Sequence, residues 1–184
     1  CELSRGLGDV YKRQIVNHVF EAELQTSEGL RSWDVGTIDL PDESDPPSLV
    51  LGFTGNSSKT GKMVAMVSDL VSSSSERKYD LDSIGDITKV GLVALAAAEW
   101  DAVGMAMDAC HDRLDALNLS TPFLEKLIAA VRPHSLGAKL TGAGGGGCMM
   151  ALTRDPARVA QMIELHGAQA MISPLYNVGA NILS

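Results

Sequence analysis

The chain has 184 residues, of which 45% are hydrophobic and 21% charged, and its formal net charge is −8. These values are typical of a globular protein that can bury a core, and they exclude a disordered chain. The acidic balance argues against a nucleic-acid-binding surface, which is usually basic, and no apolar run reaches the ~18 residues that a membrane span needs.

The N-terminal quarter predicts a β-hairpin that follows a segment of foreign origin. Residues 1–14 resemble a translated sequencing adapter and are expected not to be native; the alternative is a genuine basic strand. From Ile15, apolar and polar residues alternate, which predicts a strand over 15–25, a turn at Ser27-Glu-Gly29 and a return strand over 30–38. Residues 39–47 hold four acids and three prolines and predict an exposed loop.

The rest of the chain predicts a second unit, an α+β domain over residues 49–184, with 15–48 as the end of a preceding domain. Apolar residues recur at helical spacing in the middle of the chain, and shorter apolar runs bounded by Gly or Pro predict strands. The predicted order is a strand over 49–53, helices over 59–71, 81–95 and 100–117, a helix opened by Ser120-Thr-Pro122, strands over 138–141 and 148–152, a helix from Asp155-Pro156 to Leu165, and a closing strand over 170–183. This order favours an antiparallel sheet with several helices packed on one face.

A glycine-rich segment, Lys139-Leu-Thr-Gly-Ala-Gly-Gly-Gly-Gly-Cys148, connects two of the predicted strands. Consecutive glycines let a backbone bend tightly and turn several N–H groups toward one anion, so a phosphate is the expected ligand. The alternative is a tight β-turn or a flexible linker, although linkers normally have polar surroundings. The spacing matches neither the P-loop nor the dinucleotide-binding glycine motif.

This segment resembles the third signature motif of the GHMP kinases, the superfamily of galactokinase, homoserine kinase, mevalonate kinase and phosphomevalonate kinase. Within the superfamily, residues 137–148 are most similar to the archaeal and bacterial mevalonate kinase family. The segment from His111 to Glu125 and the strand-to-helix segment from Leu49 to Thr60 are similar to that family in the same order. The resemblance implies the C-terminal domain of a GHMP kinase, with a ferredoxin-like core.

The resemblance also implies which residues contact ligands. It assigns the nucleotide-phosphate loop to Thr141, Gly142, Ala143, Gly144, Gly145 and Gly146. Thr141 is the side chain of that set able to donate a hydrogen bond to a phosphate or substrate oxygen. Thr60 matches a threonine close to the acceptor substrate, and it would look the same as a simple helix cap. Ser57 or Ser58 are the other candidate caps of that helix.

Several residues have a structural interpretation that competes with a functional one. We expect His111 to be a satisfied helix histidine rather than a base, Lys139 to be structural, and Cys110 and Cys148 to be small core residues. Asp34 is a weak candidate for the general base, because its context differs from the family motif. No catalytic residue or metal ligand is therefore assigned, and we expect the general-base Asp upstream of Ile15.

Taken together, the chain is expected to be the C-terminal part of an ATP-dependent small-molecule kinase. By resemblance, the whole enzyme would transfer the γ-phosphoryl group of ATP to the 5-hydroxyl of mevalonate, with ATP and Mg²⁺ as cofactors, and this chain alone would be inactive. Mevalonate and ATP are the expected partners, without nucleic acid or membrane, and a homodimer is allowed. The three unpaired cysteines indicate a cytoplasmic protein. The alternatives are phosphomevalonate kinase, mevalonate 3-kinase, homoserine kinase, or a non-catalytic α+β module that binds an anion.

Overall fold

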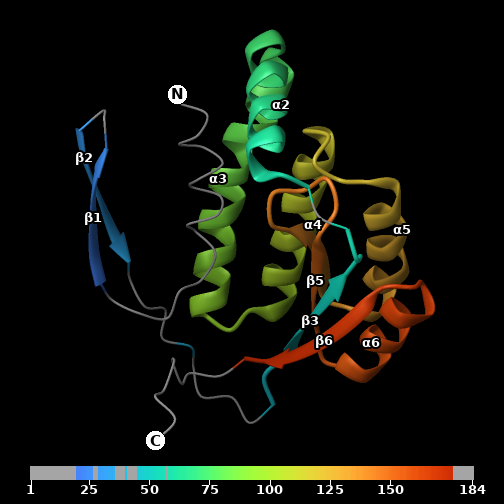
Figure 1. The fold of residues 1–184 in the computed structure, drawn as a ribbon. Coiled ribbons are helices and arrows are strands. Elements are labelled where there is room, and N and C mark those ends of the chain that lie inside the picture. The colour runs from blue at the N-terminus through green and yellow to red at the C-terminus, as the bar shows by residue number, and fades with distance from the viewer. Residues whose placement is uncertain (1–19, 27–28, 36–39, 41–44, 57, 176–184) are drawn as a thin grey trace, which may run out of the picture.

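The computed structural model describes residues 20–26, 29–35, 40, 45–56 and 58–175. Residues 1–14, and the outer ends of the predicted hairpin at 15–19 and 36–38, lie outside the described residues. In chain order the elements are β1 (Phe20–Thr26), β2 (Gly29–Val35), β3 (Ser48–Phe53), α2 (Thr60–Ser73), α3 (Ser75–Ala96), α4 (Trp100–Ala116), α5 (Pro122–Val131), a short 3₁₀ turn (Arg132–His134), β4 (Gly137–Thr141), β5 (Cys148–Thr153), α6 (Pro156–Leu165) and β6 (Gln169–Pro174) (Figure 1).

The four strands of the main sheet are all antiparallel to their neighbours, in the order β4-β5-β3-β6. Their chain order with the intervening helices is strand, helices, strand, strand, helix, strand, which is the ferredoxin-like arrangement. The central strand β3 places Val50 opposite Ala151 of β5 and Ile172 of β6. The predicted α+β class with an antiparallel sheet is therefore confirmed. The predicted hairpin also forms, with β1 and β2 paired as a separate two-stranded sheet.

Three of the helices begin after a polar residue whose side chain accepts a backbone hydrogen bond. Thr121 caps α5 by accepting from the N–H of Leu124, and Asp155 caps α6 by accepting from the N–H of Arg158; Pro follows each cap at the first helical position. Ser74 caps α3 in the same way, through the N–H of Arg77. Because of this cap, α3 begins at Ser75, six residues before the predicted start at 81, in a polar stretch that carries no apolar periodicity.

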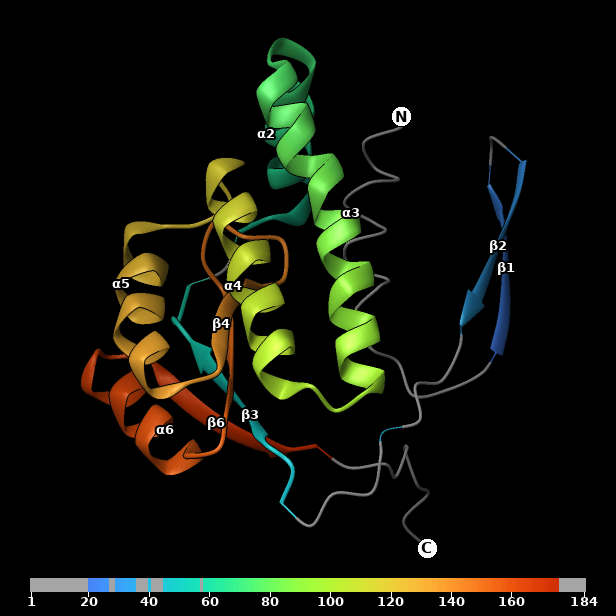
Figure 2. The same ribbon diagram turned by 180° about the vertical axis from the view of Figure 1, so that it is seen from behind.

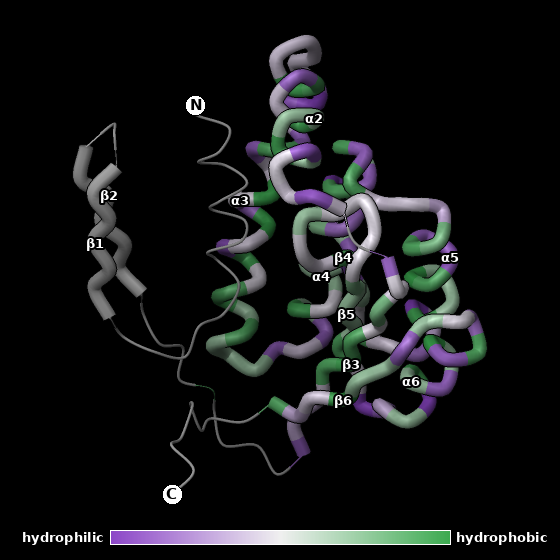
Figure 3. Tube along the Cα trace, viewed as in Figure 1, coloured by the Kyte–Doolittle hydropathy of each residue, from purple (hydrophilic) through white to green (hydrophobic). Residues whose placement is uncertain are grey.

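Helices α5 and α6 cover one face of the sheet. The main hydrophobic core lies between that face and the helices. The strands contribute the buried side chains of Val50, Leu140, Met149 and Ala151, which meet buried residues of both helices. Figure 3 shows hydrophobic residues concentrated along β3, β4 and β5, and Figure 2 shows the helices from behind. On the opposite face, a smaller cluster joins Leu152 of β5 to Leu95 and Trp100, at the connection between α3 and α4.

Helix α4 lies along the outer edge of β4 and hydrogen-bonds to it. The N–H of Ala138 donates to Asp108 Oδ1 at 2.8 Å, and the N–H of Leu140 donates to His111 Nδ1 at 3.3 Å. An edge strand normally leaves these N–H groups unpaired, so side chains of α4 replace a neighbouring strand. Gly104 of α4 and Gly137 of β4 meet backbone to backbone at this contact.

The long helices α3 and α4 are joined by a buried ion-pair network. The Asp80 carboxylate, 3% exposed as a residue, accepts hydrogen bonds from Arg77 and from Arg113, each at 2.9 Å. Arg77 also donates to the carbonyl of Ala116 at the end of α4. A buried carboxylate needs partners of this kind because an unpaired buried charge is strongly destabilising.

Within the described part of the chain, no helix is both long and apolar enough to span a membrane.

Candidate functional site

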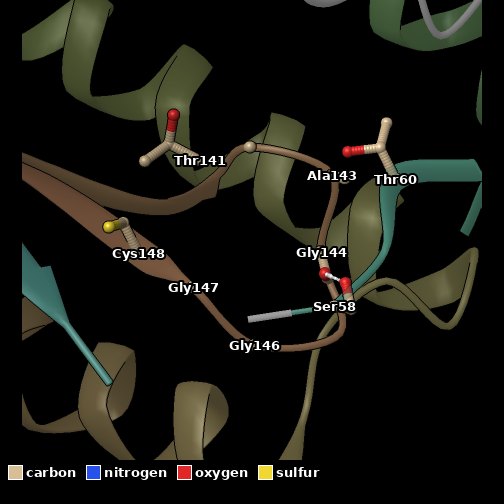
Figure 4. Close-up of a pocket in the computed structure, with 9 residues that line it drawn as sticks. Ser58, Thr60, Thr141, Ala143, Gly144, Gly146, Gly147 and Cys148 are labelled. Atoms are coloured by element: carbon tan, nitrogen blue, oxygen red, sulfur yellow. Dashed lines mark hydrogen bonds between the residues drawn. The ribbon is translucent and has the colours of Figure 1, made fainter. Parts of the chain in front are cut away.

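The glycine-rich segment forms a loop, residues 142–147, that joins β4 to β5 and passes the start of α2 (Figure 4). Five of its six residues have a positive φ: Gly142 at 92°, Gly144 at 82°, Gly145 at 69°, Gly146 at 128° and Gly147 at 84°. These left-handed values are what glycine adopts without steric penalty. Glycine at these five positions therefore permits a backbone course that most other residues would find strained.

Four hydrogen bonds hold the loop in that conformation. The N–H of Gly145 donates to the carbonyl of Leu119 at 2.8 Å, and the N–H of Gly147 donates to the carbonyl of Asn56 at 2.6 Å. The carbonyl of Gly147 in turn accepts from the N–H of Thr54 at 2.9 Å, and the carbonyl of Gly144 accepts from the hydroxyl of Ser58. The loop is thus attached to the β3–α2 connection on one side and to the α4–α5 connection on the other.

The remaining N–H groups of the loop are available to a ligand. Gly142, Ala143, Gly144 and Gly146 donate to no acceptor among the described residues. Buried or half-buried N–H groups without a protein partner are uncommon, because each lost hydrogen bond is unfavourable. A tight turn made only to reverse the chain has no need of four such groups.

A pocket of about 290 Å³ opens at this loop. Its walls come from three places, the loop, the ends of β4 and β5, and the start of α2, through the residues Ser58, Thr60, Thr141, Gly142, Ala143, Gly144, Gly146, Gly147 and Cys148. Figure 4 shows Thr60 beside Ala143, with its hydroxyl directed toward the loop, and the hydrogen bond between Ser58 and Gly144. None of these lining residues carries a carboxylate.

The structure brings together most of the residues proposed from the sequence. Thr141, Gly142, Ala143, Gly144, Gly146 and Thr60 all line the pocket. Gly145 is not among the lining residues. An added Cβ at Gly145 would lie 2.8 Å from the Met63 sulfur and 2.9 Å from Ser58 Oγ. Ser58 and Gly147 also belong to the pocket wall, and neither was predicted from the sequence as a site residue.

Two of the three expected caps of α2, Thr60 and Ser58, are wrong, and the third, Ser57, lies outside the described residues. Thr60 is the first helical residue and Lys59 is the N-cap, without any side-chain cap bond. Ser58 does not cap the helix, because its hydroxyl donates to the carbonyl of Gly144. The start of α2 therefore keeps free N–H groups and the partial positive charge of a helix N-terminus, next to the pocket.

The other candidates from the sequence are also placed. Lys139 is 9% exposed, so it does not point to solvent; burial lowers the pKa of its ammonium group, with the nearby Cys110 thiol acting in the opposite direction. Cys110 is buried as expected, and burial raises its pKa. Cys148 is half-buried and lines the pocket, so its expected place in the core is wrong. Asp34 lies in β2, where it pairs with Glu21 of β1.

His111 is a satisfied buried histidine, as expected. Its Nδ1 accepts from the N–H of Leu140, and its Nε2 is 2.9 Å from Glu125 Oε1. An Nδ1 that accepts must be unprotonated, so the neutral ring carries its proton on Nε2 and donates it to Glu125. Burial lowers the pKa of His111 from its usual 6.5, Arg132 lowers it further, and Glu125 and Asp112 act in the opposite direction.

This lowered pKa predicts acid sensitivity. The unfolded chain takes up a proton on His111 near pH 6.5, whereas the folded chain takes it up only at lower pH. The stability that the neutral ring provides is therefore complete above pH 6.5 and is lost as the pH falls from there through the lowered pKa. We expect the free energy of unfolding, measured by urea denaturation between pH 8 and 5, to fall in this window. The fall should be smaller in His111→Gln than in the wild type, and the same as in the wild type in His134→Gln. Equal pH dependence in the wild type and both variants would contradict this prediction.

A metal site is not evident at the pocket. In the described residues, no group of three or more His, Cys, Asp or Glu side chains is placed to hold a metal ion. Protein ligands of Mg²⁺ are usually one or two carboxylates, together with substrate phosphates. The lining residues supply neutral hydroxyls and backbone groups instead, so they fit an anion and do not by themselves fit a Mg²⁺ ion.

Comparisons with known proteins agree with this geometry. Residues 92–167 match the family described as GHMP kinases C terminal. The chain is 37% identical over 142 residues to mevalonate kinase of Pyrococcus furiosus, an alignment that covers 73% of this chain and 42% of that protein. It is 35% identical over 81 residues to mevalonate kinase of Methanocaldococcus jannaschii. The chain thus spans less than half the length of the curated relatives.

Solved structures show the same fold. L. major mevalonate kinase, determined in complex with R-mevalonate, superposes with a TM-score of 0.63 at 24% identity over 79% of this chain and 43% of that one. Streptococcus pneumoniae phosphomevalonate kinase, in complex with phosphomevalonate and AMPPNP, superposes with a TM-score of 0.58 at 20% identity over 83% of this chain and 43% of that one. The described region therefore has the fold of part of these kinases, and its residues 92–167 match the C-terminal domain of the GHMP kinases.

Proposed function

We propose that this chain is the C-terminal portion of an ATP-dependent kinase that phosphorylates mevalonate on its 5-hydroxyl. The loop 142–147 contacts the phosphates of the nucleotide, and Thr60 and Thr141 lie on the side of the acceptor. The observation that carries this proposal is the set of four loop residues whose N–H groups have no described protein acceptor and which line a pocket beside the N-terminus of α2.

The electrostatics of the pocket favour an anion. Backbone N–H groups and a helix N-terminus both present partial positive charge, and each is a common phosphate-binding device. The first turn of α2 has no acidic residue, and it carries Lys62 after the N-cap Lys59. No lining residue brings a carboxylate that would repel a phosphate. The net charge of −8 does not oppose this, because a local backbone site is independent of it.

The pocket size suits a phosphate chain rather than a complete nucleotide and acceptor. Sites for small molecules usually have volumes of about 300–1,000 Å³, and this pocket has about 290 Å³. Streptococcus pneumoniae phosphomevalonate kinase, solved with phosphomevalonate and AMPPNP, is more than twice as long as the part of it that this chain covers. We infer that the nucleoside and most of the acceptor are bound by residues outside the described region.

In the proposed reaction, the acceptor hydroxyl oxygen forms a bond to the γ-phosphorus of ATP while the bond to the ADP oxygen breaks. The hydroxyl proton must be accepted by a base, and no lining residue is suited to this role. We therefore propose that the base lies upstream of residue 15. The loop N–H groups orient the phosphates and stabilise their charge, which is the main protein contribution to phosphoryl transfer. Mg²⁺, when present, would neutralise charge on the phosphates.

The proposal is tested with a chimeric enzyme. Residues 49–184 replace the matching C-terminal part of Pyrococcus furiosus mevalonate kinase, and ATP-dependent phosphorylation of mevalonate is measured. We expect turnover by the chimera and none by the isolated 184-residue chain, because the described residues that line the pocket include no suitable base. Circular dichroism and gel filtration establish that the chimera is folded.

The outcomes separate the alternatives. Turnover with phosphomevalonate or homoserine but not mevalonate would reassign the acceptor. A folded chimera without activity toward any of these alcohols would contradict the kinase proposal and leave an anion-binding module. Phosphorylation of mevalonate by the isolated chain would show that its own residues complete the active site.

A further inference from the structure

A closed series of contacts links the glycine loop to the helices behind it. Leu140, the penultimate residue of β4, donates its N–H to Nδ1 of His111 at 3.3 Å. His111 projects from α4 and is 1% exposed. Its other nitrogen, Nε2, lies 2.9 Å from Oε1 of Glu125 on α5. One imidazole ring therefore connects β4, α4 and α5 at the base of the loop.

The contacts continue from Glu125 back to the loop. The hydroxyl of Ser120 donates to the same Glu125 oxygen. Its neighbour Leu119 accepts the N–H of Gly145 through its carbonyl at 2.8 Å, and Gly144 packs directly against Leu119. The series thus runs from Leu140 through His111, Glu125 and the 119–120 segment to Gly145, and the loop itself closes it.

We propose that His111, held in its tautomer and orientation by Glu125 and Ser120, is a positioning residue that sets the conformation of the glycine loop and thereby its anion-binding geometry. His111 does not line the pocket, so it acts through Leu140 and the α4–α5 connection. Its role as a loop support rests on contacts alone. The consequence for anion binding rests on the proposed function of the loop.

The physical reason is that the loop cannot hold itself. Its glycines have no side chains to pack, and glycine loses more conformational freedom on ordering than other residues. Its shape must come from anchors at its ends, from Leu119, and from the β3–α2 connection, where Asn56 and Ser58 bond to it. Of the two bonds from α4 to the edge of β4, the one to Leu140 is nearer to the loop, because Leu140 comes two residues before Gly142. Ala138, which donates to Asp108 at 2.8 Å, is two residues further away.

Two substitutions test the two hydrogen bonds of His111 separately. The oxygen of Asn can take the place of Nδ1, so His111→Asn retains an acceptor for the N–H of Leu140 and loses the bond to Glu125. The amide nitrogen of Gln can take the place of Nε2, so His111→Gln retains the donor to Glu125 and leaves the Leu140 N–H without an acceptor. Asp108→Asn is the matched control, because it alters the neighbouring bond between α4 and the β4 edge.

The experiment is hydrogen–deuterium exchange on the complete chain, read out by mass spectrometry in peptides over residues 140–148 and over α6. We expect loop exchange to increase about tenfold in His111→Gln, because a buried N–H without its acceptor opens more readily. His111→Asn and Asp108→Asn should stay within about threefold of the wild type in the loop. Exchange in α6 should not change in any of them. Glu125→Leu, which removes the support of the ring, should also increase loop exchange.

Binding of inorganic tripolyphosphate, followed by ³¹P NMR, distinguishes this inference from the proposed function. Weaker binding by His111→Gln, parallel to its faster loop exchange, is the expected result. Loop exchange that rises equally in His111→Gln, His111→Asn and Asp108→Asn, together with α6, would reduce His111 to a general stabilising role and overturn the inference. If the exchange results are as expected but the wild type does not bind tripolyphosphate, His111 positions the loop and the anion proposal is wrong.

Discussion

Alanine at Gly104 or Gly137 is expected to destabilise the chain by about 3 kcal/mol or more. At Gly104 an added Cβ would lie 2.1 Å from the carbonyl oxygen of Leu136, and at Gly137 it would lie 2.0 Å from the carbonyl oxygen of Gly104. Both neighbours are backbone atoms, which cannot turn aside as a flexible side chain can. Helix α4 must therefore move away from β4, and the bonds from Asp108 and His111 to the strand edge are lost with it.

Urea denaturation of each variant measures this effect. Gly61→Ala is the matched control, because Gly61 lies in α2 with no atom within 4 Å of an added Cβ. Alanine is the better helix former, so this change should be neutral or should stabilise by up to about 1 kcal/mol. Wild-type stability of Gly104→Ala would mean that α4 and β4 do not meet backbone to backbone.

Alanine at Gly144 is expected to lower stability by about 2–3 kcal/mol and to abolish anion binding by the loop. An added Cβ would lie 2.4 Å from the carbonyl oxygen of Leu119, and φ at this position is +82°. Leu119 is 1% exposed and belongs to the main core, so it cannot move aside. The loop must then move away from the α4–α5 connection, which changes the wall of the pocket that it forms.

Gly167→Ala is the control for this second change. Gly167 has nearly the same φ, +85°, but an added Cβ there meets no atom within 4 Å, and the residue is remote from the pocket wall. It should lose only about 1 kcal/mol through backbone strain and bind tripolyphosphate as the wild type does. Equal stability losses at the two positions, or unchanged tripolyphosphate binding by Gly144→Ala, would show that contact with Leu119 does not shape the loop.

Local features of the sequence predicted the elements well where the signal itself is local. The Thr121-Pro122 and Asp155-Pro156 pairs marked the starts of α5 and α6, because a cap and its helix are adjacent in the chain. The start of α3 was missed, since its cap Ser74 precedes a polar turn without apolar spacing. The closing strand β6 ends at Pro174 in the structure, and the predicted continuation beyond 175 lies outside the described residues.

Which residues form the pocket wall required the folded chain. The glycine run indicated a loop for an anion, yet it could not show that Gly145 turns away from the pocket or that two of the loop N–H groups are used by Leu119 and Asn56. The role of Ser58 was also hidden, because its partner Gly144 is 86 residues away. A serine before a helix looks the same in sequence whether it caps that helix or holds a distant loop.

By itself, the sequence determined most of the helices and strands, the α+β class, the position of the glycine loop and the resemblance to GHMP kinases, since each of these depends on neighbouring residues or on a contiguous motif. Only the tertiary structure decided how α4 covers the edge of β4 and how Gly104 meets Gly137. It also decided that His111 bonds both to Leu140, 29 residues away in the chain, and to Glu125. The reason is physical: secondary structure follows from spacing along the chain, whereas hydrogen-bond partners between elements follow from packing, which brings together groups that no local pattern connects.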